Sequence, residues 1–184
     1  MCNNHASDGR GHRRRRRAGW AAAVPVVAAA AMAMPAHANT FDRKALADAL
    51  DDEYRAEATY QAVIDKFGPV RPFINIIEAE KRHSSMVRGQ YARLGMKAPA
   101  NPYLGKIEAP ASLLKACELG VEAEVENIAL YDKLLPRVSD PAVRQVLSQL
   151  QAASRDNHLP AFQRCVARGG TPGRGPGGGG RGWN

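Results

Sequence analysis

Glu80 and His83 stand three residues apart in a stretch with the apolar spacing of a helix, and this offset places both side chains on one helix face. Carboxylate and imidazole donors without a thiolate suit iron or manganese, and zinc accepts the same donors. Open positions on such a metal permit oxygen or peroxide chemistry. The pair therefore indicates a metal site inside a helical protein.

Further ionisable residues occupy positions that a packed helix normally gives to apolar side chains, namely Glu53, Glu57, Glu124 and His158. Several carboxylates buried together are costly without a cation, because like charges repel and desolvation favours their neutral forms. Glu53 stands seven residues before Tyr60. The same spacing joins Glu124 to Tyr131, as a duplicated helix hairpin would leave it. We interpret both tyrosines as ordinary core residues, the alternative being a redox role or a role in supporting the ligands.

Apolar residues at alternating steps of three and four predict four helices. The expected ranges are 40–67, 72–94, 112–135 and 140–165. Ser112 is a candidate N-cap, and Asp140 followed by Pro141 is a typical helix start. No convincing alternation of apolar and polar residues predicts a strand, so the expected fold class is all-α.

The lengths of the connections predict the topology. The first and last are only a few residues long, which makes helices 1 and 2 antiparallel neighbours, and likewise helices 3 and 4. The Pro-rich connection 95–111 can extend about 50 Å at roughly 3.3 Å per residue, whereas a helix of about 23 residues is about 35 Å long. We therefore expect two antiparallel helix hairpins joined by one long crossover, the arrangement of ferritin-like four-helix bundles.

At these positions the chain resembles the ferritin-like superfamily, whose first and third helices each give a glutamate and whose second and fourth each give Glu-x-x-His to a di-iron site. The blocks that carry the resemblance are Asp52-Glu53-Tyr54, Glu78-Ala79-Glu80-Lys81-Arg82-His83, Gly120-Val121-Glu122-Ala123-Glu124 and Ser154-Arg155-Asp156-Asn157-His158-Leu159-Pro160-Ala161-Phe162. They are similar to an uncharacterised, rubrerythrin-related family of exported bacterial ferritin-like domains. The resemblance spans roughly 42–166 and implies five metal ligands, with iron as the expected metal: Glu53, Glu80, His83, Glu124 and His158.

Arg155 stands three residues before His158, where the resemblance would place a glutamate. Two interpretations follow. In the first, one metal position is open or is completed by Glu57 or water. In the second, Arg155 folds inward and leaves a metal-free, salt-bridged core. The first interpretation predicts a dinuclear metal protein, an oxidoreductase with ferroxidase or peroxide-reducing activity. The second predicts a non-catalytic scaffold or partner-binding protein of the cell envelope. Pro160 removes a helix hydrogen bond and could turn the imidazole away from the interior.

Cys117 and Cys165 are the cysteines that follow residue 38. Cys117 lies seven residues before Glu124, and Cys165 lies seven residues after His158. If these two candidate ligands face one another on antiparallel helices, both cysteines lie about 10 Å along the bundle on the same side. We therefore predict a disulfide between them, the alternative being two separate buried thiols.

The net charge of +8 arises from arginines at the two ends of the chain, and the segment between them is balanced. A nucleic-acid-binding fold carries a basic patch on the domain itself, so no nucleic-acid partner is expected. We expect metal ions as partners, and a homodimer is left open.

Residues 1–38 combine an arginine run, an Ala-rich apolar segment and the motif Ala36-His37-Ala38, which together predict a cleaved signal peptide. We therefore expect a periplasmic or secreted protein without a stable membrane anchor, and the Sec and twin-arginine routes both stay open. The bundle is expected over 39–168. A disordered Gly/Arg-rich tail is expected over 169–184.

Overall fold

The computed structural model describes residues 39–171, and within this range it is all-helical with no strand. The elements are α1 (Thr40–Phe67), α2 (Phe73–Arg93), α3 (Leu113–Leu134), α4 (Pro141–Ala153), a π-helical turn η1 (Ser154–His158) and α5 (Leu159–Ala167). Since α4, η1 and α5 follow one another without a loop, they form one long fourth helix. The all-α prediction is confirmed. The expected signal peptide and residues 172–184 of the expected tail lie outside the described residues.

Side chains cap the helices where the sequence predicts them. The Ser112 side chain accepts a hydrogen bond from the backbone N–H of Lys115 at the start of α3. Asp140 accepts from two backbone N–H groups of the first turn of α4, in front of Pro141. These bonds satisfy donors that have no partner inside the helix. At the C-terminal end of α1, Gly68 adopts φ 82°, a conformation that glycine takes without strain.

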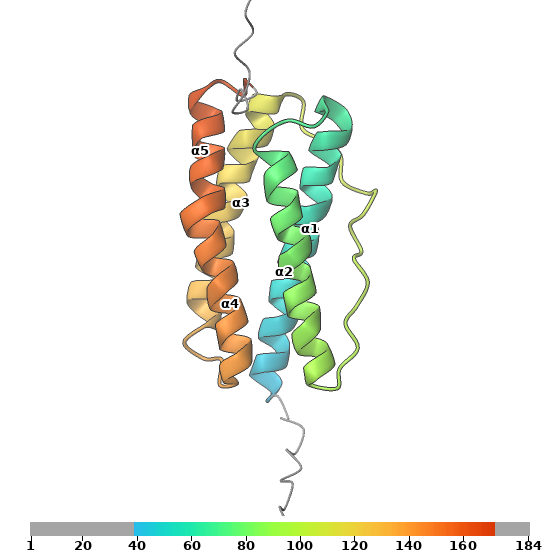
Figure 1. Ribbon diagram of the computed structural model, residues 1–184, viewed down its shortest axis with the longest axis vertical. Coiled ribbons are helices and arrows are strands. Elements are labelled where there is room, and N and C mark those ends of the chain that lie inside the picture. Colours follow the sequence, from blue (N-terminus) through green and yellow to red (C-terminus); the bar gives the residue numbers. More distant parts are fainter. Residues whose placement is uncertain (1–38, 172–184) are drawn as a thin grey trace, which may run out of the picture. The chain divides into compact units, whose positions relative to one another are not determined.

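The four long helices lie side by side, with α1 packed against α2 and α3 packed against α5 (Figure 1). The segment between α2 and α3 runs along the outside of the bundle, past α1. Two hydrogen bonds attach it to Tyr54 of α1: the Tyr54 hydroxyl donates to the carbonyl of Pro99, and Asn101 donates to the Tyr54 carbonyl. No helix among the described residues is long and apolar enough to cross a membrane.

Two apolar clusters fill the two halves of the bundle. One includes Leu46, Leu50, Val87, Leu147 and Leu150, and the other includes Tyr60, Phe73, Ile76, Phe162 and Cys165. Fully burying one large apolar side chain contributes about 1.5–3 kcal/mol, so the two clusters dominate the packing energy. Glu53, Glu80, His83, Glu124 and His158 are buried where the two clusters meet. These five residues form a polar layer with apolar packing on both sides.

A disulfide joins Cys117 of α3 to Cys165 of α5, with their Cα atoms 5.9 Å apart. This confirms the predicted pairing. Beside it, Gly120 lets the two helices approach closely, because a Cβ atom at this position would lie 2.6 Å from the ring of Phe162. The contact fixes the register of α3 against α5 near the polar layer.

Candidate metal centre

The polar layer brings together five of the predicted ligands, one or two from each long helix. They are Glu53 of α1, Glu80 and His83 of α2, Glu124 of α3 and His158 at the end of η1, and all five are buried. Their ligand atoms form two groups that could hold a metal ion, and within each group these atoms lie within 4.8 Å of one another. Glu80 belongs to both groups.

Each oxygen of the Glu80 carboxylate faces one histidine. Oε2 lies 3.0 Å from Nδ1 of His83, and Oε1 lies 3.1 Å from Nδ1 of His158. A second carboxylate completes each group, since Glu53 lies 3.3 Å from Nδ1 of His83 and Glu124 lies 3.6 Å from Nδ1 of His158. The layer is therefore two sets of three ligands that share one carboxylate, an arrangement that could hold two neighbouring cations.

The two tyrosines of the repeated Glu-x6-Tyr pattern bond crosswise between α1 and α3. Tyr60 donates a hydrogen bond of 2.9 Å to Glu124, and Tyr131 donates one of 2.8 Å to Glu53. Burial and the neighbouring carboxylates raise the pKa of both phenols well above the usual range, so both stay protonated donors. Both tyrosines are buried core residues, as predicted. Their hydroxyl groups in addition hold two of the candidate ligands, and the repeated Glu-x6-Tyr spacing was the sequence signal of this link.

Without a metal, protons supply the positive charge of this layer. Burial lowers the pKa of His83, but hydrogen bonds to Glu53 and Glu80 outweigh it and raise the pKa to about 9. The nearby carboxylates of Glu124 and Glu80 likewise outweigh the effect of burial and raise the pKa of His158 to about 10. Both imidazoles are therefore cationic at neutral pH.

The carboxylates respond to the same partners. Burial, followed by repulsion from Glu80, raises the pKa of Glu53. Burial also acts to raise the pKa of Glu80, but the neighbouring imidazoles of His158 and His83 outweigh it and lower the pKa. Glu80 is therefore an anion held between two imidazolium groups. A cation that displaced these protons would meet carboxylates already arranged around it.

One buried atom of the layer is not satisfied by the protein itself. Nδ1 of His158 lies near two carboxylates but makes no hydrogen bond of acceptable geometry among the described residues. Buried polar atoms are nearly always hydrogen-bonded. An imidazole nitrogen that faces carboxylate oxygens without such a bond fits the donor set of a metal ion.

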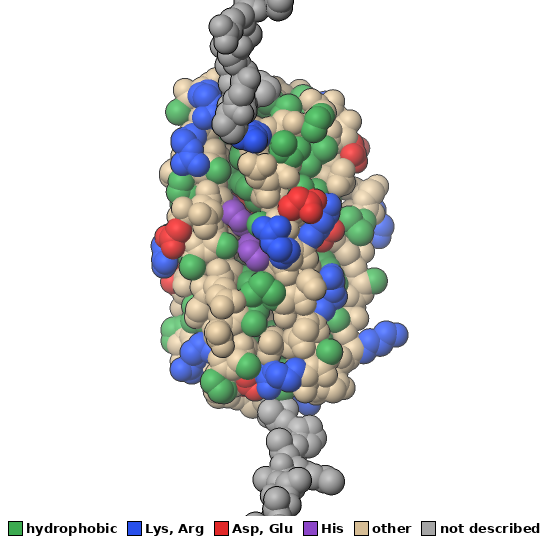
Figure 2. Space-filling model, in the orientation of Figure 1, with side chains coloured by type: hydrophobic (Ala, Val, Ile, Leu, Met, Phe, Trp, Pro, Cys, Tyr) green, Lys and Arg blue, Asp and Glu red, His purple; other side chains and the backbone are tan. Residues whose placement is uncertain are grey.

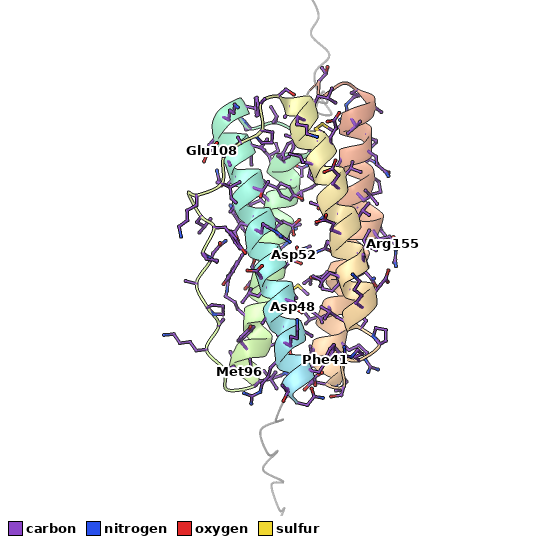
Figure 3. The ribbon with its side chains drawn as sticks, turned by 180° about the vertical axis from the view of Figure 1, so that it is seen from behind. Phe41, Asp48, Asp52, Met96, Glu108 and Arg155 are labelled. Atoms are coloured by element: carbon purple, nitrogen blue, oxygen red, sulfur yellow. A yellow bond between two sulfur atoms is a disulfide. The ribbon has the colours of Figure 1, made fainter. Side chains whose placement is uncertain are left out.

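Two other residues singled out by the sequence do not join the layer. Glu57 is half-buried and belongs to neither group of ligands. The side chain of Arg155 is 57% exposed, pairs with Asp156 and points away from the bundle (Figure 3). The interpretation in which Arg155 folds inward to neutralise the core carboxylates is therefore wrong.

The π-turn explains where Arg155 lies. Pro160 has no N–H to donate within the helix, and the chain widens just before it, so that the N–H of Leu159 bonds to the carbonyl of Ser154, five residues earlier. The wider turn places Ser154, and not Arg155, one turn before His158 on the inner face. His158 stays buried, so Pro160 does not turn the imidazole away from the interior.

A cavity of about 300 Å³ reaches the layer between α1 and α3. It is lined by all three clustered carboxylates and by neither histidine. Histidine atoms appear instead on the opposite side of the bundle, between α2 and the fourth helix (Figure 2). A reagent in the cavity would therefore approach the site from its carboxylate side.

Three polar residues beside the ligands were not predicted. Ser154 donates to the side chain of Asn127 on α3, and Asn127 donates to Asp52 on α1. All three line the cavity. No motif in the sequence marks Asn127, because its role depends on a contact with a residue far along the chain.

Comparisons with known proteins relate the chain to two solved structures. A hypothetical protein, MJ0754, from Methanococcus jannaschii DSM 2661 is 20% identical with a TM-score of 0.63, over 71% of this chain and 82% of that one. A conserved hypothetical protein, rv2844, from Mycobacterium tuberculosis is 18% identical with a TM-score of 0.56, over 69% of this chain and 91% of that one. These likenesses concern the fold alone. No protein-family model and no curated protein matches the chain.

Proposed function

We propose that the protein is an exported ferritin-like protein that binds two divalent metal ions, with iron as the expected metal and manganese or zinc as alternatives. Glu53, Glu80 and His83 would hold one ion. Glu80, Glu124 and His158 would hold the other. The observation that carries the proposal is the position of Glu80, whose two oxygens each face one histidine.

The donor set supports iron, because mixed carboxylate and imidazole ligands without a thiolate suit it. A bound iron pair would supply oxidation and reduction chemistry toward oxygen or peroxide, so ferroxidase or peroxide-reducing activity is the activity we propose. In this proposal the chain's own residues bind the ions and orient the ligands. Tyr60 and Tyr131 each hold a carboxylate in place, while the cavity between α1 and α3 gives a small reagent access to the layer.

A second candidate is a metal-free bundle that acts as an envelope scaffold or partner-binding protein. One observation favours it: His83 and His158, once protonated, can balance the buried carboxylates without a metal. Arg155 plays no part in this version, since it faces solvent.

Anaerobic titration of the metal-free protein with Fe(II) separates the two candidates. The metal protein takes up two equivalents per chain, and exposure to oxygen or peroxide then oxidises the bound iron faster than free iron. The matched control is Glu78→Ala. Glu78 lies on α2 with Glu80, but its carboxylate is exposed and pairs with Lys81. Protein that takes up no iron, manganese or zinc would leave the scaffold as the function.

A further inference from the structure

We infer that Asn127 is a positioning residue that decides which side chain of the fourth helix faces the metal site, an inference that rests on the proposed function. Asn127 is buried on α3, and it makes hydrogen bonds to two other helices. It contacts none of the five candidate ligands through a hydrogen bond of its own among the described residues. Its action on the site is therefore through the residues that it holds.

The directions of these hydrogen bonds are fixed by chemistry. The Asp52 carboxylate only accepts, so the amide NH₂ of Asn127 must face it, at 2.5 Å between Nδ2 and Oδ2. The amide oxygen therefore faces Ser154, whose hydroxyl must donate, at 2.8 Å. Arg55 holds the other oxygen of Asp52. The chain of bonds is thus directional and ends in an ion pair.

Each member of this chain stands beside a candidate ligand. Asp52 immediately precedes Glu53 on α1, and Asn127 lies one helical turn after Glu124 on α3. Ser154 begins the π-turn that His158 ends. The network therefore joins three of the four ligand-bearing helices at the level of the metal site.

The bond to Ser154 selects the register of the fourth helix. Ser154 and Arg155 are adjacent, and a helix turns about 100° per residue, so only one of them can face the interior one turn before His158. Asn127 gives the buried Ser154 hydroxyl its acceptor. Pro160 opens the turn, and the bond from Ser154 to Asn127 holds the opened turn with Ser154 facing inward. Without that bond, an orphaned buried hydroxyl favours a rotation of the turn that brings Arg155 toward the carboxylates. A guanidinium at that position would repel a metal ion, because arginine keeps its charge.

The test measures Co(II) binding by metal-free protein, both as a dissociation constant and as the absorption spectrum of the bound ion, which reports its ligands. Asn127→Leu, of similar volume, and Ser154→Ala should each weaken Co(II) binding about 10- to 100-fold, the usual effect of losing a partner that orients a ligand. Both should also change the spectrum. The double variant should be no worse than either single one, since both break the same bond.

Two further variants separate positioning from general stability. Ser154→Thr keeps a hydroxyl and should restore the wild-type affinity and spectrum. Gln151→Ala removes another amide that joins the fourth helix to α3, by bonds to Ile128 and Asp132 away from the ligands, and should lower only the melting temperature. If Asn127→Leu does not fold, the Ser154→Ala and Ser154→Thr pair decides the question.

The outcomes are distinct for the two proposals. Wild-type protein that binds no Co(II), Fe(II), Mn(II) or Zn(II) overturns the proposed function. Wild-type protein that binds two ions, together with a Ser154→Ala variant of unchanged affinity and spectrum, overturns the role of Asn127 and leaves the proposed function standing. Additive losses in the double variant also overturn it, because the two side chains would then act separately.

Discussion

The phenol of Tyr60 on α1 donates a hydrogen bond to Glu124 on α3, and the two residues are the aromatic and acidic members of different Glu-x6-Tyr repeats. Tyr131 on α3 donates the corresponding hydrogen bond to Glu53 on α1. Each hairpin therefore orients the carboxylate of the other. This exchange makes the candidate metal site depend on the packing of α1 against α3 and not on either hairpin alone.

Removing either phenol should affect one ligand group more than the other. Tyr60→Phe should weaken the ion held by Glu124 and His158, and Tyr131→Phe should weaken the ion held by Glu53 and His83, each by about tenfold or more because an orienting partner is lost. Loss of a hydrogen bond to a charged carboxylate should also lower the free energy of unfolding by about 1.5–3 kcal/mol. Stepwise metal titration and denaturant melts measure both effects.

The matched control is Tyr91→Phe, a buried tyrosine in the apolar cluster nearer the start of α1. It should leave both metal equivalents unchanged. Equal weakening of both ions by Tyr60→Phe and by Tyr131→Phe would contradict the crosswise assignment.

Glu80 should be the one ligand whose loss removes both ions. Glu80→Ala takes the shared carboxylate from both groups, whereas Glu53→Ala or Glu124→Ala takes a ligand from one group only. We expect the bound metal per chain to fall from two equivalents to none in the first variant and to about one in the others. Metal analysis after equilibrium dialysis measures this, with Glu78→Ala as the control. Retention of one tight equivalent by Glu80→Ala would show that the two positions are independent.

The fold was predictable from local signals and the site only in part. The spacing of apolar residues and caps such as Ser112 and Asp140 predict where helices begin, because helix starts depend on residues that are neighbours in the sequence. Charged residues at core positions identified Glu53, Glu80, His83, Glu124 and His158 as a buried set.

What the sequence did not predict depends on contacts between helices. The spacing from Arg155 to His158 assumes a regular helix, and the π-turn before Pro160 breaks that assumption by one residue. Asn127 has no partner nearby in the sequence, so its bonds become visible only when α1, α3 and the fourth helix are packed. Apolar periodicity therefore does not predict the exact side-chain register of a helix that contains a π-turn.

The metal-free protein should lose stability as the pH rises. The folded-state pKa values of His83 and His158, about 9 and about 10, lie above the usual value of 6.5. Protonation therefore stabilises the fold fully below about pH 6.5, and this contribution is lost as the pH rises through 9 to 10. Glu53, whose pKa is also raised, adds to the same fall. The total effect is on the order of a few kcal/mol.

Bound metal should reverse this dependence, because metal binding requires the ligands to lose their protons. Melting curves between pH 6 and 10, with and without Mn(II), measure both trends. The metal-dependent rise in melting temperature should grow with pH. A double variant, His83→Gln with His158→Gln, should reduce the alkaline loss in the metal-free protein to the part that Glu53 causes. A loss of undiminished size would place its cause elsewhere.

The cavity between α1 and α3 should control how fast metal reaches the site. Leu119 lines this cavity and is 38% exposed, so Leu119→Trp should narrow its opening without touching a ligand. Stopped-flow mixing with Co(II) should show slower uptake by several-fold, while the equilibrium dissociation constant stays unchanged because release slows equally. Val125→Trp is the matched control, since Val125 is exposed on the same helix but does not line the cavity. Unchanged uptake by Leu119→Trp would direct attention to the opposite face, where histidine atoms reach the surface.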